Sequence, residues 1–424
     1  MTSWTRREFS GGLAGAAALP VLRPRAARSQ AKVKVVVIGG GVGGATVARY
    51  LAASTPAVEV TLVEPRTLYA TCFFSNLYIA GFRSFQSLTH GYGAFAGRYG
   101  ISVVHDSATA VESDLKTVKL ESGAVLSYDR LVVAPGIAFR DGAIAGYDEA
   151  AMQVMPHAWK AGPQSKLLHR QLQTMEDGGL FVLVVPPDPF RCPPAPYERA
   201  SLVAAYFQRH KPRSKILILD AKDTFPGQNL FEDAWARNYP GMIEWLPAQF
   251  TGGVKEVDGK ARLIKTAGGG AFTAAVANVI PAQMAGQIAQ RSGLTDQSGW
   301  CPVDPITFES TLQPGIHLVG DTIIAGDMPK SAFSANSQAK ACAFAIGASL
   351  TGFPPPAPHL FNTCYTFLAP DEAWSNAISF KPVGATIRTA HMFVSKVEDS
   401  AETRHQSARE AEGWYTAFTE DVFG

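Results

Sequence analysis

Residues 33–64 read VKVVVIGGGVGGATVARYLAASTPAVEVTLVE, and this stretch decides the fold of the chain. The apolar run at 33–38 predicts a buried parallel strand. Residues 45–53 predict a helix, and the run at 58–63 predicts a second strand. A strand, a helix and a second strand in this order indicate a parallel βαβ unit.

Glycines at fixed positions join the first strand to the helix. Gly39, Gly41 and Gly44 form the pattern G-x-G-x-x-G, and Glu64 ends the second strand 20 positions after the last of them. Glycines at these places permit a tight turn and bring a pyrophosphate close to the helix N-terminus, and the acid binds ribose hydroxyls. The sequence therefore predicts a dinucleotide-binding site.

Two later segments favour FAD as the dinucleotide. Residues 128–136 (YDRLVVAPG) are similar to the strand and tight turn found mid-chain in flavoproteins with two dinucleotide folds, and they include Pro135 and Gly136. Residues 315–321 (GIHLVGD) resemble the late FAD motif of the same proteins. In that motif the aspartate at the strand end, here Asp321, binds the ribityl chain or a neighbouring phosphate group. The alternative role for Asp321 is that of a helix N-cap.

A second nucleotide fold begins at residues 180–186 (LFVLVVP), which predict another buried strand. The glycine loop that should follow is replaced by PPDPFRCPP at 186–194. Proline has no N–H to donate to a phosphate. The sequence therefore predicts that NAD(P) does not bind here, and Cys192 stands where the loop would be.

The order of these motifs predicts four parts in an α/β chain. They are an export signal at 1–31, a discontinuous FAD-binding domain at 32–145 and 278–352, a second Rossmann-like domain at 146–277, and a small C-terminal α+β domain at 353–424 that covers the flavin and meets a partner. Within the second domain we expect a helix from near Tyr197 and a strand at 215–220.

The N-terminal part predicts export rather than structure. Arg6 and Arg7 precede a mildly apolar stretch rich in Gly and Ala, and Ser29-Gln30-Ala31 offers a small-x-small cleavage site. This pattern is typical of a twin-arginine (Tat) signal and predicts a periplasmic protein. The alternative is a basic tail. No later segment predicts a membrane-spanning helix.

Composition excludes some partners. The 424 residues are 46% hydrophobic, so the chain can bury large cores. Its 38 basic and 36 acidic residues provide no basic field for nucleic acid.

The chain has five cysteines, and none of them belongs to a C-x-x-C or C-x-x-C-H pattern. The spacing therefore predicts neither a zinc site of that type nor a c-type haem on this chain. Cys301 and Cys342 are expected to be structural. Cys72 follows the first strand pair, in a region that approaches the flavin, and is either a packing residue or the site of a thioether to the flavin.

Cys192 and Cys364 lie in proline-rich and polar surroundings respectively, outside any apolar helical stripe. A bridge between them would close a loop of roughly 170 residues, for which chain entropy gives roughly 4–5 kcal/mol of stabilisation. The alternative is a redox disulfide that a thiolate can open.

Taken together, the motifs resemble the flavoprotein subunit of flavocytochrome c sulfide dehydrogenase, in the glutathione reductase-like FAD superfamily. Nearly the whole chain after the signal takes part. The segments that carry the resemblance are residues 71–76, 87–92, 104–109, 156–162, 190–200, 299–304, 327–331, 334–338, 362–365 and 414–424.

The resemblance implies roles for individual residues. Cys72 would hold FAD covalently, Cys192 and Cys364 would form the redox-active disulfide, and Glu198 beside them would accept a proton. Glu198 also suits the N-terminal turn of a helix. The implied flavin neighbours are Trp414, otherwise a core anchor, and Lys330, otherwise a surface lysine.

The function implied is oxidation of hydrosulfide through the disulfide and FAD, with electrons leaving to a c-type cytochrome subunit in a heterodimer. The first alternative is the related flavoprotein of the periplasmic thiosulfate-oxidising (Sox) system, acting as a redox accessory that reactivates a sulfur carrier. A membrane quinone reductase of the same fold is a further alternative. An NADH-dependent disulfide reductase would need the missing phosphate loop.

Overall fold

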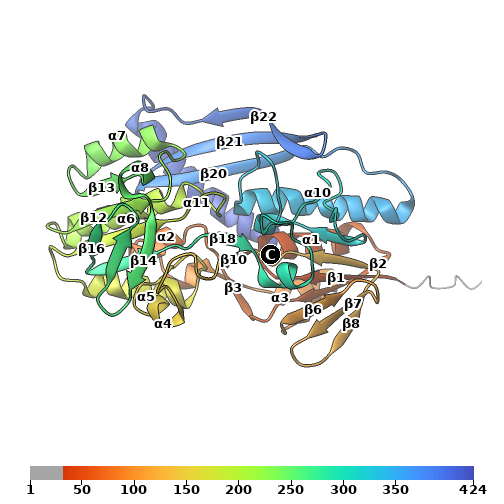
Figure 1. Ribbon diagram of the computed structural model, residues 1–424. Coiled ribbons are helices and arrows are strands. Elements are labelled where there is room, and N and C mark those ends of the chain that lie inside the picture. The colour runs from red at the N-terminus through yellow and green to blue at the C-terminus, as the bar shows by residue number, and fades with distance from the viewer. Residues whose placement is uncertain (1–31) are drawn as a thin grey trace, which may run out of the picture. The chain divides into compact units, whose positions relative to one another are not determined.

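The computed structural model describes residues 32–424, so the export signal predicted at 1–31, with Arg6 and Arg7, lies outside the described residues. The first predicted domain is built on a five-stranded parallel sheet (Figure 1). Its order is β19 (Ile316–Leu318), β9 (Arg130–Val133), β1 (Val33–Ile38), β2 (Val58–Val63) and β5 (Ser102–Val104). The strand that the late motif predicts therefore joins the sheet of the first strand, as the discontinuous arrangement requires.

The helix after β1 begins earlier than the sequence predicted. Helix α1 spans Val42–Ser54 and starts directly after its N-cap Gly41, so Gly43 and Gly44 lie in its first turn. A side chain at Gly39, where φ is 100°, would place its Cβ 2.4 Å from the Ala134 carbonyl oxygen. A Cβ at Gly44 would lie 1.9 Å from the Gly39 carbonyl oxygen. Only glycine lets the helix pack this closely against the strand.

A second parallel sheet confirms the second Rossmann-like unit. Its order is β13 (Ile243–Leu246), β12 (Lys215–Asp220), β11 (Leu180–Val185) and β17 (Val276–Val279). Helix α6 (Ala195–His210) follows β11, and α7 (Gln228–Asn238) follows β12. Strand β17 extends to Val279, so the sheet ends two residues beyond the boundary predicted at 277.

The C-terminal part is an antiparallel sheet of β20 (Leu360–Ala369), β21 (Glu372–Val383) and β22 (Thr386–Val394), followed by helix α11 (Ala401–Phe423). Strand β20 contacts helix α10 (Ala332–Thr351) of the first domain and helices α6 and α7 of the second. In Figure 1 this sheet runs along the top of the view across both units. It therefore brings residues of the C-terminal part to the junction of the two nucleotide folds.

Smaller elements complete the chain. They are β3 (Leu68–Ala70), α2 (Ser75–Ile79), β4 (Thr89–Gly91), α3 (Gly93–Tyr99), β6 (Ala108–Glu112), β7 (Thr117–Leu120), β8 (Val125–Ser127), β10 (Ile137–Phe139), α4 (Glu149–Met152), α5 (Pro163–Thr174), α8 (Ala248–Thr251), β14 (Val254–Asp258), β15 (Leu263–Thr266), β16 (Ala271–Thr273), β18 (Gln283–Ala285) and α9 (Gln287–Arg291), with 3₁₀ turns at 86–88 and 320–322.

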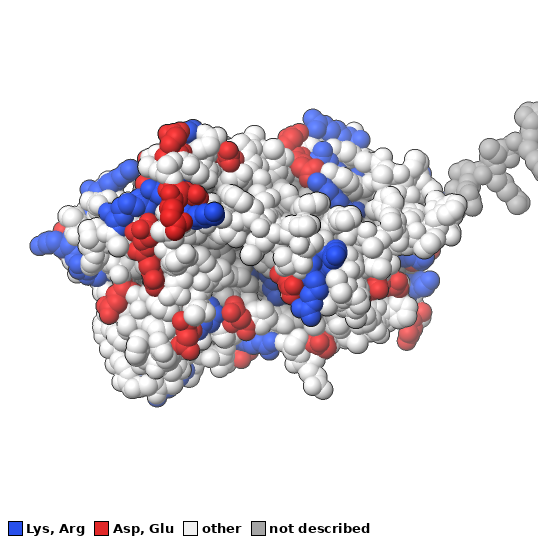
Figure 2. All heavy atoms as spheres, turned by 90° about the horizontal axis from the view of Figure 1, so that it is seen from above, with Lys and Arg blue, Asp and Glu red and all other residues white. Residues whose placement is uncertain are grey.

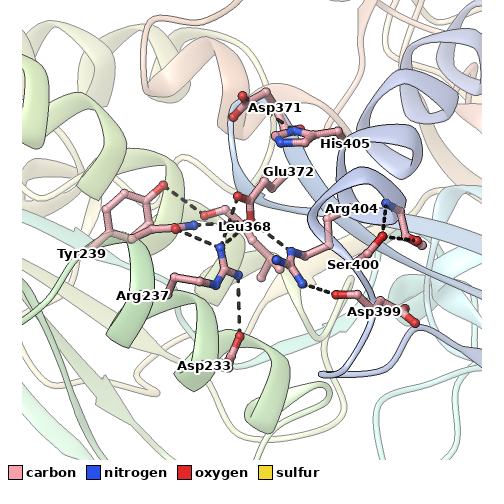
Figure 3. A network of polar contacts seen from close by, with 12 residues as sticks. Asp233, Arg237, Tyr239, Leu368, Asp371, Glu372, Asp399, Ser400, Arg404 and His405 are labelled. Carbon is pink, nitrogen blue, oxygen red and sulfur yellow. Dashed lines mark hydrogen bonds and ion pairs between the residues drawn. The ribbon is translucent and has the colours of Figure 1, made fainter.

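Polar contacts fasten the C-terminal part to the second unit (Figure 3). Glu372, at the start of β21, accepts a hydrogen bond of 2.9 Å from Arg237 of α7 and lies 3.3 Å from the Arg404 guanidinium of α11. The Tyr239 hydroxyl donates to the Leu368 carbonyl at 3.1 Å. One partly buried carboxylate thus holds two helices from different parts of the chain.

The surface and the helices give two further observations. In Figure 2, Lys and Arg side chains lie among Asp and Glu side chains, with wide uncharged areas between them. Among residues 32–424 no helix combines the length and apolar character that crossing a bilayer requires.

Candidate functional site

The residues predicted to bind the dinucleotide surround one cavity. It holds about 960 Å³ of empty space, part of it open to solvent. Its walls include Gly39, Gly41, Glu64, Cys72, Pro135, Gly136 and Asp321. Gly44 is absent from this wall, because its role is the close packing of helix on strand. The βαβ unit and the two later motifs thus meet at this cavity, although 282 positions of sequence separate Gly39 from Asp321.

Two carboxylates in this cavity have different surroundings. Glu64 is held by the glycine loop: its Oε2 accepts a hydrogen bond of 2.8 Å from the Gly40 N–H, and its Oε1 accepts from Arg66. Asp321 Oδ1 is buried without a hydrogen-bond partner among residues 32–424, and burial raises the pKa of this carboxyl group. A buried acceptor without a donor is rare in folded proteins. Hydroxyl groups of a bound ribityl chain would satisfy it, so the donor set fits a flavin dinucleotide.

A second cavity adjoins the first and contains the predicted catalytic residues. Cys192, Cys364, Glu198 and Trp414 all line it, with several aromatic side chains beside them. Cys72 and Arg191 line both cavities. The structure therefore places Cys72 where the cofactor cavity meets the sulfur-lined cavity.

Cys192 sits in an unusual backbone conformation at the end of the proline-rich loop. Its φ is 55°, in the left-handed region that a non-glycine residue rarely adopts. Its N–H donates to the Lys330 carbonyl at 2.7 Å, and its own carbonyl accepts from the Ala195 N–H at 3.0 Å. Such strain is maintained only where the surroundings enforce it, and it clusters at functional sites.

The five cysteines are unbonded thiols in the structure. Cys192 and Cys364 face the same cavity, so the geometry brings the predicted pair together without joining it, and the disulfide stays a prediction. Burial raises the pKa of the Cys364 thiol to about 11, and burial together with the nearby Cys364 and Glu198 raises that of Cys192 well above its usual value. Cys301 and Cys342 are fully buried, as expected for structural residues.

Glu198 lies in the first turn of α6, as predicted. Its Oε1 accepts a hydrogen bond of 2.9 Å from the Phe367 N–H of β20, and its Oε2 accepts one of 2.7 Å from the Asn76 amide. Burial raises the pKa of this carboxyl group to about 7, although both hydrogen bonds and Arg199 act in the opposite direction. A carboxyl group that changes its charge near neutral pH is suited to accepting and returning a proton.

The two predicted flavin neighbours have different surroundings in the structure. The buried Trp414 indole N–H has no partner in the described residues, and its ring packs against Phe418, with 4.9 Å between centroids. Its contact with a flavin stays a prediction. The Lys330 amine instead donates to the Asp321 and Ile323 carbonyls at 2.9 and 2.6 Å and lies 3.7 Å from the Trp300 ring centroid.

Burial lowers the pKa of Lys330 to about 8. Its two hydrogen bonds brace the loop between β19 and α10, and its side chain is not part of the described walls of either cavity. Its place near the flavin stays a prediction. Lys160 and Arg191 are the basic residues from the second unit that do line the cofactor cavity. Both residues lie in segments that carry the family resemblance, at 156–162 and 190–200, but no role was predicted for either of them.

In the second nucleotide fold, the acidic residue at the end of the strand is already hydrogen-bonded to side chains of the same chain. Asp220 ends β12, where the corresponding residue of a nucleotide site binds ribose. Here its carboxylate accepts hydrogen bonds from the Tyr197 hydroxyl, the Trp245 indole at 3.0 Å and the Lys222 amine at 2.6 Å. The Tyr197 ring also stacks on Phe225, with 3.7 Å between centroids. Side chains of this chain thus occupy the acceptors that a ribose would use.

Comparison with known proteins places the chain in a family. Three family descriptions match it: "Sulfide dehydrogenase [flavocytochrome c] flavoprotein chain, central" at residues 165–281, "Flavocytochrome c sulphide dehydrogenase, flavin-binding" at 356–423, and "Pyridine nucleotide-disulphide oxidoreductase" at 33–170.

Among individual proteins, the sulfide dehydrogenase flavoprotein chain of Chlorobaculum thiosulfatiphilum is 58% identical over 43 residues, which are 10% of this chain and 90% of that sequence. Mitochondrial sulfide:quinone oxidoreductase of Mus musculus is 25% identical over 68% of this chain. The match spans 65% of the mouse protein, just under two thirds of its length.

The fold also matches solved structures. The sulfide:quinone oxidoreductase of Aquifex aeolicus superposes with a TM-score of 0.72 over 92% of this chain and 91% of that one, at 17% identity. This likeness concerns the fold alone. With the matching central and flavin-binding regions, the comparisons show that this chain belongs to the family of flavocytochrome c sulfide dehydrogenase flavoproteins.

Proposed function

We propose that this chain is an FAD-dependent oxidoreductase that oxidises hydrosulfide and passes electrons to a c-type cytochrome subunit. The observation that carries the proposal is the meeting of two cavities at Cys72 and Arg191, one with the dinucleotide motifs and one with two cysteines and the partly buried Glu198. Membership of the sulfide dehydrogenase flavoprotein family supports the substrate.

The first cavity would hold the FAD. Glu64 and the glycine loop suit its ribose and pyrophosphate, and Asp321 suits its ribityl hydroxyls. When bound, FAD accepts a pair of electrons and can release them one at a time. We further propose that Cys72 fixes the flavin through a thioether, because its side chain lies at the boundary of the two cavities.

The cysteines would perform the sulfur chemistry when oxidised to a disulfide. Sulfur of hydrosulfide attacks one Sγ, the Cys192–Cys364 bond breaks, and the departing Sγ leaves with the electron pair as a thiolate. The attacked cysteine then carries a persulfide, and Glu198 would take its proton. The thiolate holds the pair of electrons that the oxidation of sulfide supplies.

Features of the second nucleotide fold support the proposal that electrons do not come from NAD(P)H. Its phosphate loop contains prolines without N–H groups, and Asp220 is engaged with the chain's own donors. We therefore infer that this fold acts as a scaffold that presents Cys192 to the second cavity, beside the one that would hold the flavin.

The electron acceptor is proposed to be a cytochrome, and the likeness to sulfide:quinone oxidoreductases makes quinone the second candidate. The twin arginines and the cleavage pattern near residue 31 support a periplasmic location, where a c-type cytochrome would be available. Mixing sulfide-reduced protein with cytochrome c or with a soluble quinone, and measuring which one reoxidises the flavin, decides between them.

The function is tested by anaerobic addition of sulfide to the purified FAD protein while the flavin absorbance is followed. We expect bleaching in the wild type, and none in Cys192→Ser or Cys364→Ser although both retain flavin. Cys301→Ser is the matched control, because its buried thiol lies outside the described walls of both cavities. Bleaching by NADH at low concentration, or normal sulfide reduction in either active-site variant, would contradict the proposal.

A further inference from the structure

In the described part of the chain, the hydrogen-bond partners of the buried cation Arg199 are all uncharged. Its side chain follows Glu198 on α6, and the residue is 2% exposed. Its guanidinium donates to the side-chain oxygens of Asn76 and Asn278 at 2.9 and 2.6 Å. Its remaining acceptors are the carbonyl oxygens of residues 157 and 158. A buried charge is normally held against an opposite charge, so the role of this one requires an explanation.

Asn76 connects this cation to the cavity. Its Oδ1 accepts from Arg199 Nε at 2.9 Å, and its Nδ2 donates to Glu198 Oε2 at 2.7 Å and to the Ala195 carbonyl at 3.0 Å. A guanidinium can only donate hydrogen bonds. The amide oxygen must therefore face Arg199, and the amide N–H groups must face Glu198.

This fixed direction has an electrostatic consequence. An N–H donor aimed at a carboxyl group favours its ionised form, and so does a nearby positive charge. Burial acts against ionisation and raises the pKa of Glu198 to about 7. The other ionisable groups that face Glu198 are the thiols of Cys192 and Cys364, which gain a negative charge only when deprotonated.

We propose that Asn76 is a positioning residue of the sulfur cavity: its amide relays the charge of the buried Arg199 to Glu198 and orients that carboxylate. The relay keeps the carboxylate available as the acceptor of a proton from the sulfur nucleophile. This inference rests on the proposed function for the identity of that nucleophile, and the coupling of the three side chains is independent of it.

Asn76→Asp tests the relay with little change in side-chain size. An aspartate attracts Arg199 but repels Glu198, so the Glu198 carboxyl group should ionise at higher pH. We expect the pH midpoint for flavin reduction by sulfide to rise by about one unit or more. In a Glu198→Gln background the same substitution should shift nothing further. A purely structural role would lower rates without moving the midpoint.

A second measurement separates this inference from the proposed function. The infrared C=O band of the protonated Glu198 carboxyl group, assigned by its loss in Glu198→Gln, can be titrated in the FAD protein without sulfide. Its midpoint should rise in Asn76→Asp and in Asn76→Ser, which lacks the amide donor. If sulfide fails to reduce the wild type but the band moves, the proposed function is wrong and the relay stands. An unchanged band in both variants overturns the relay.

Discussion

Replacing Glu198 with glutamine should change how the stability of the protein depends on pH. The unfolded chain has an ordinary glutamate, whereas burial raises the folded-state pKa from 4.5 to about 7. Between these pH values the folded protein therefore holds a proton that the unfolded chain has released. Stability consequently decreases as the pH rises through this window. The loss of stability caused by Glu198 is absent below this pH window and complete above it.

The size of the cost follows from the width of the window. One pKa unit corresponds to about 1.4 kcal/mol. A shift from 4.5 to about 7 therefore destabilises the wild type by up to roughly 3 kcal/mol above neutral pH. Glutamine cannot ionise, so Glu198→Gln avoids this cost. Its lost or altered hydrogen bonds add a difference that does not vary with pH.

The assay is urea unfolding of the FAD-loaded wild type and variant in parallel buffers that span this window. The free energy of unfolding of the variant relative to the wild type should rise by roughly 3 kcal/mol between its acid and alkaline ends. Glu232→Gln, at an exposed position on α7, is the matched control and should give a flat difference. A difference for Glu198→Gln that is equally flat would refute the reasoning, because it would mean that the pKa of the Glu198 carboxyl group is not raised.

Three further predictions concern other parts of the molecule. Lys222→Met removes the amine 2.6 Å from the buried Asp220 carboxylate and should lower the free energy of unfolding in urea by about 3–5 kcal/mol. Adding Asp220→Asn should recover most of this loss. A loss below about 1 kcal/mol would argue against a charged pair. Acid-denatured wild-type protein should keep its yellow colour and Cys72→Ser should release it, whereas free flavin from the wild type would exclude the thioether. Tyr415→Phe deletes the hydroxyl that lies 3.1 Å from Thr71 Oγ1, beside Cys72. It should lower the free energy of unfolding by about 1–3 kcal/mol and reduce the fraction of chains that carry flavin in intact-mass measurements. An unchanged fraction would show that α11 does not hold this loop in place.

Local patterns were sufficient to predict much of the fold. Continuous apolar runs identified β1, β2, β11 and β12, because strands buried on both faces of a parallel sheet need apolar residues throughout. The glycine spacing identified the dinucleotide turn, because only glycine permits the contacts found at Gly39 and Gly44. The start of α1 was placed too late, since glycines have a low helix propensity and here form the first helical turn.

The sequence by itself therefore determined the two nucleotide folds, the loss of the second phosphate loop and the presence of Cys192 in its place. These features depend on residues close together in the chain. Only the tertiary structure decided which distant side chains share a cavity, because Cys364 reaches Cys192 through β20, a strand that packs across both folds. It also decided that Lys330 braces a loop and that Asn76 faces Glu198. The hydrogen bond between Asn76 and Glu198 joins residues 122 positions apart, and no local pattern specifies such a contact.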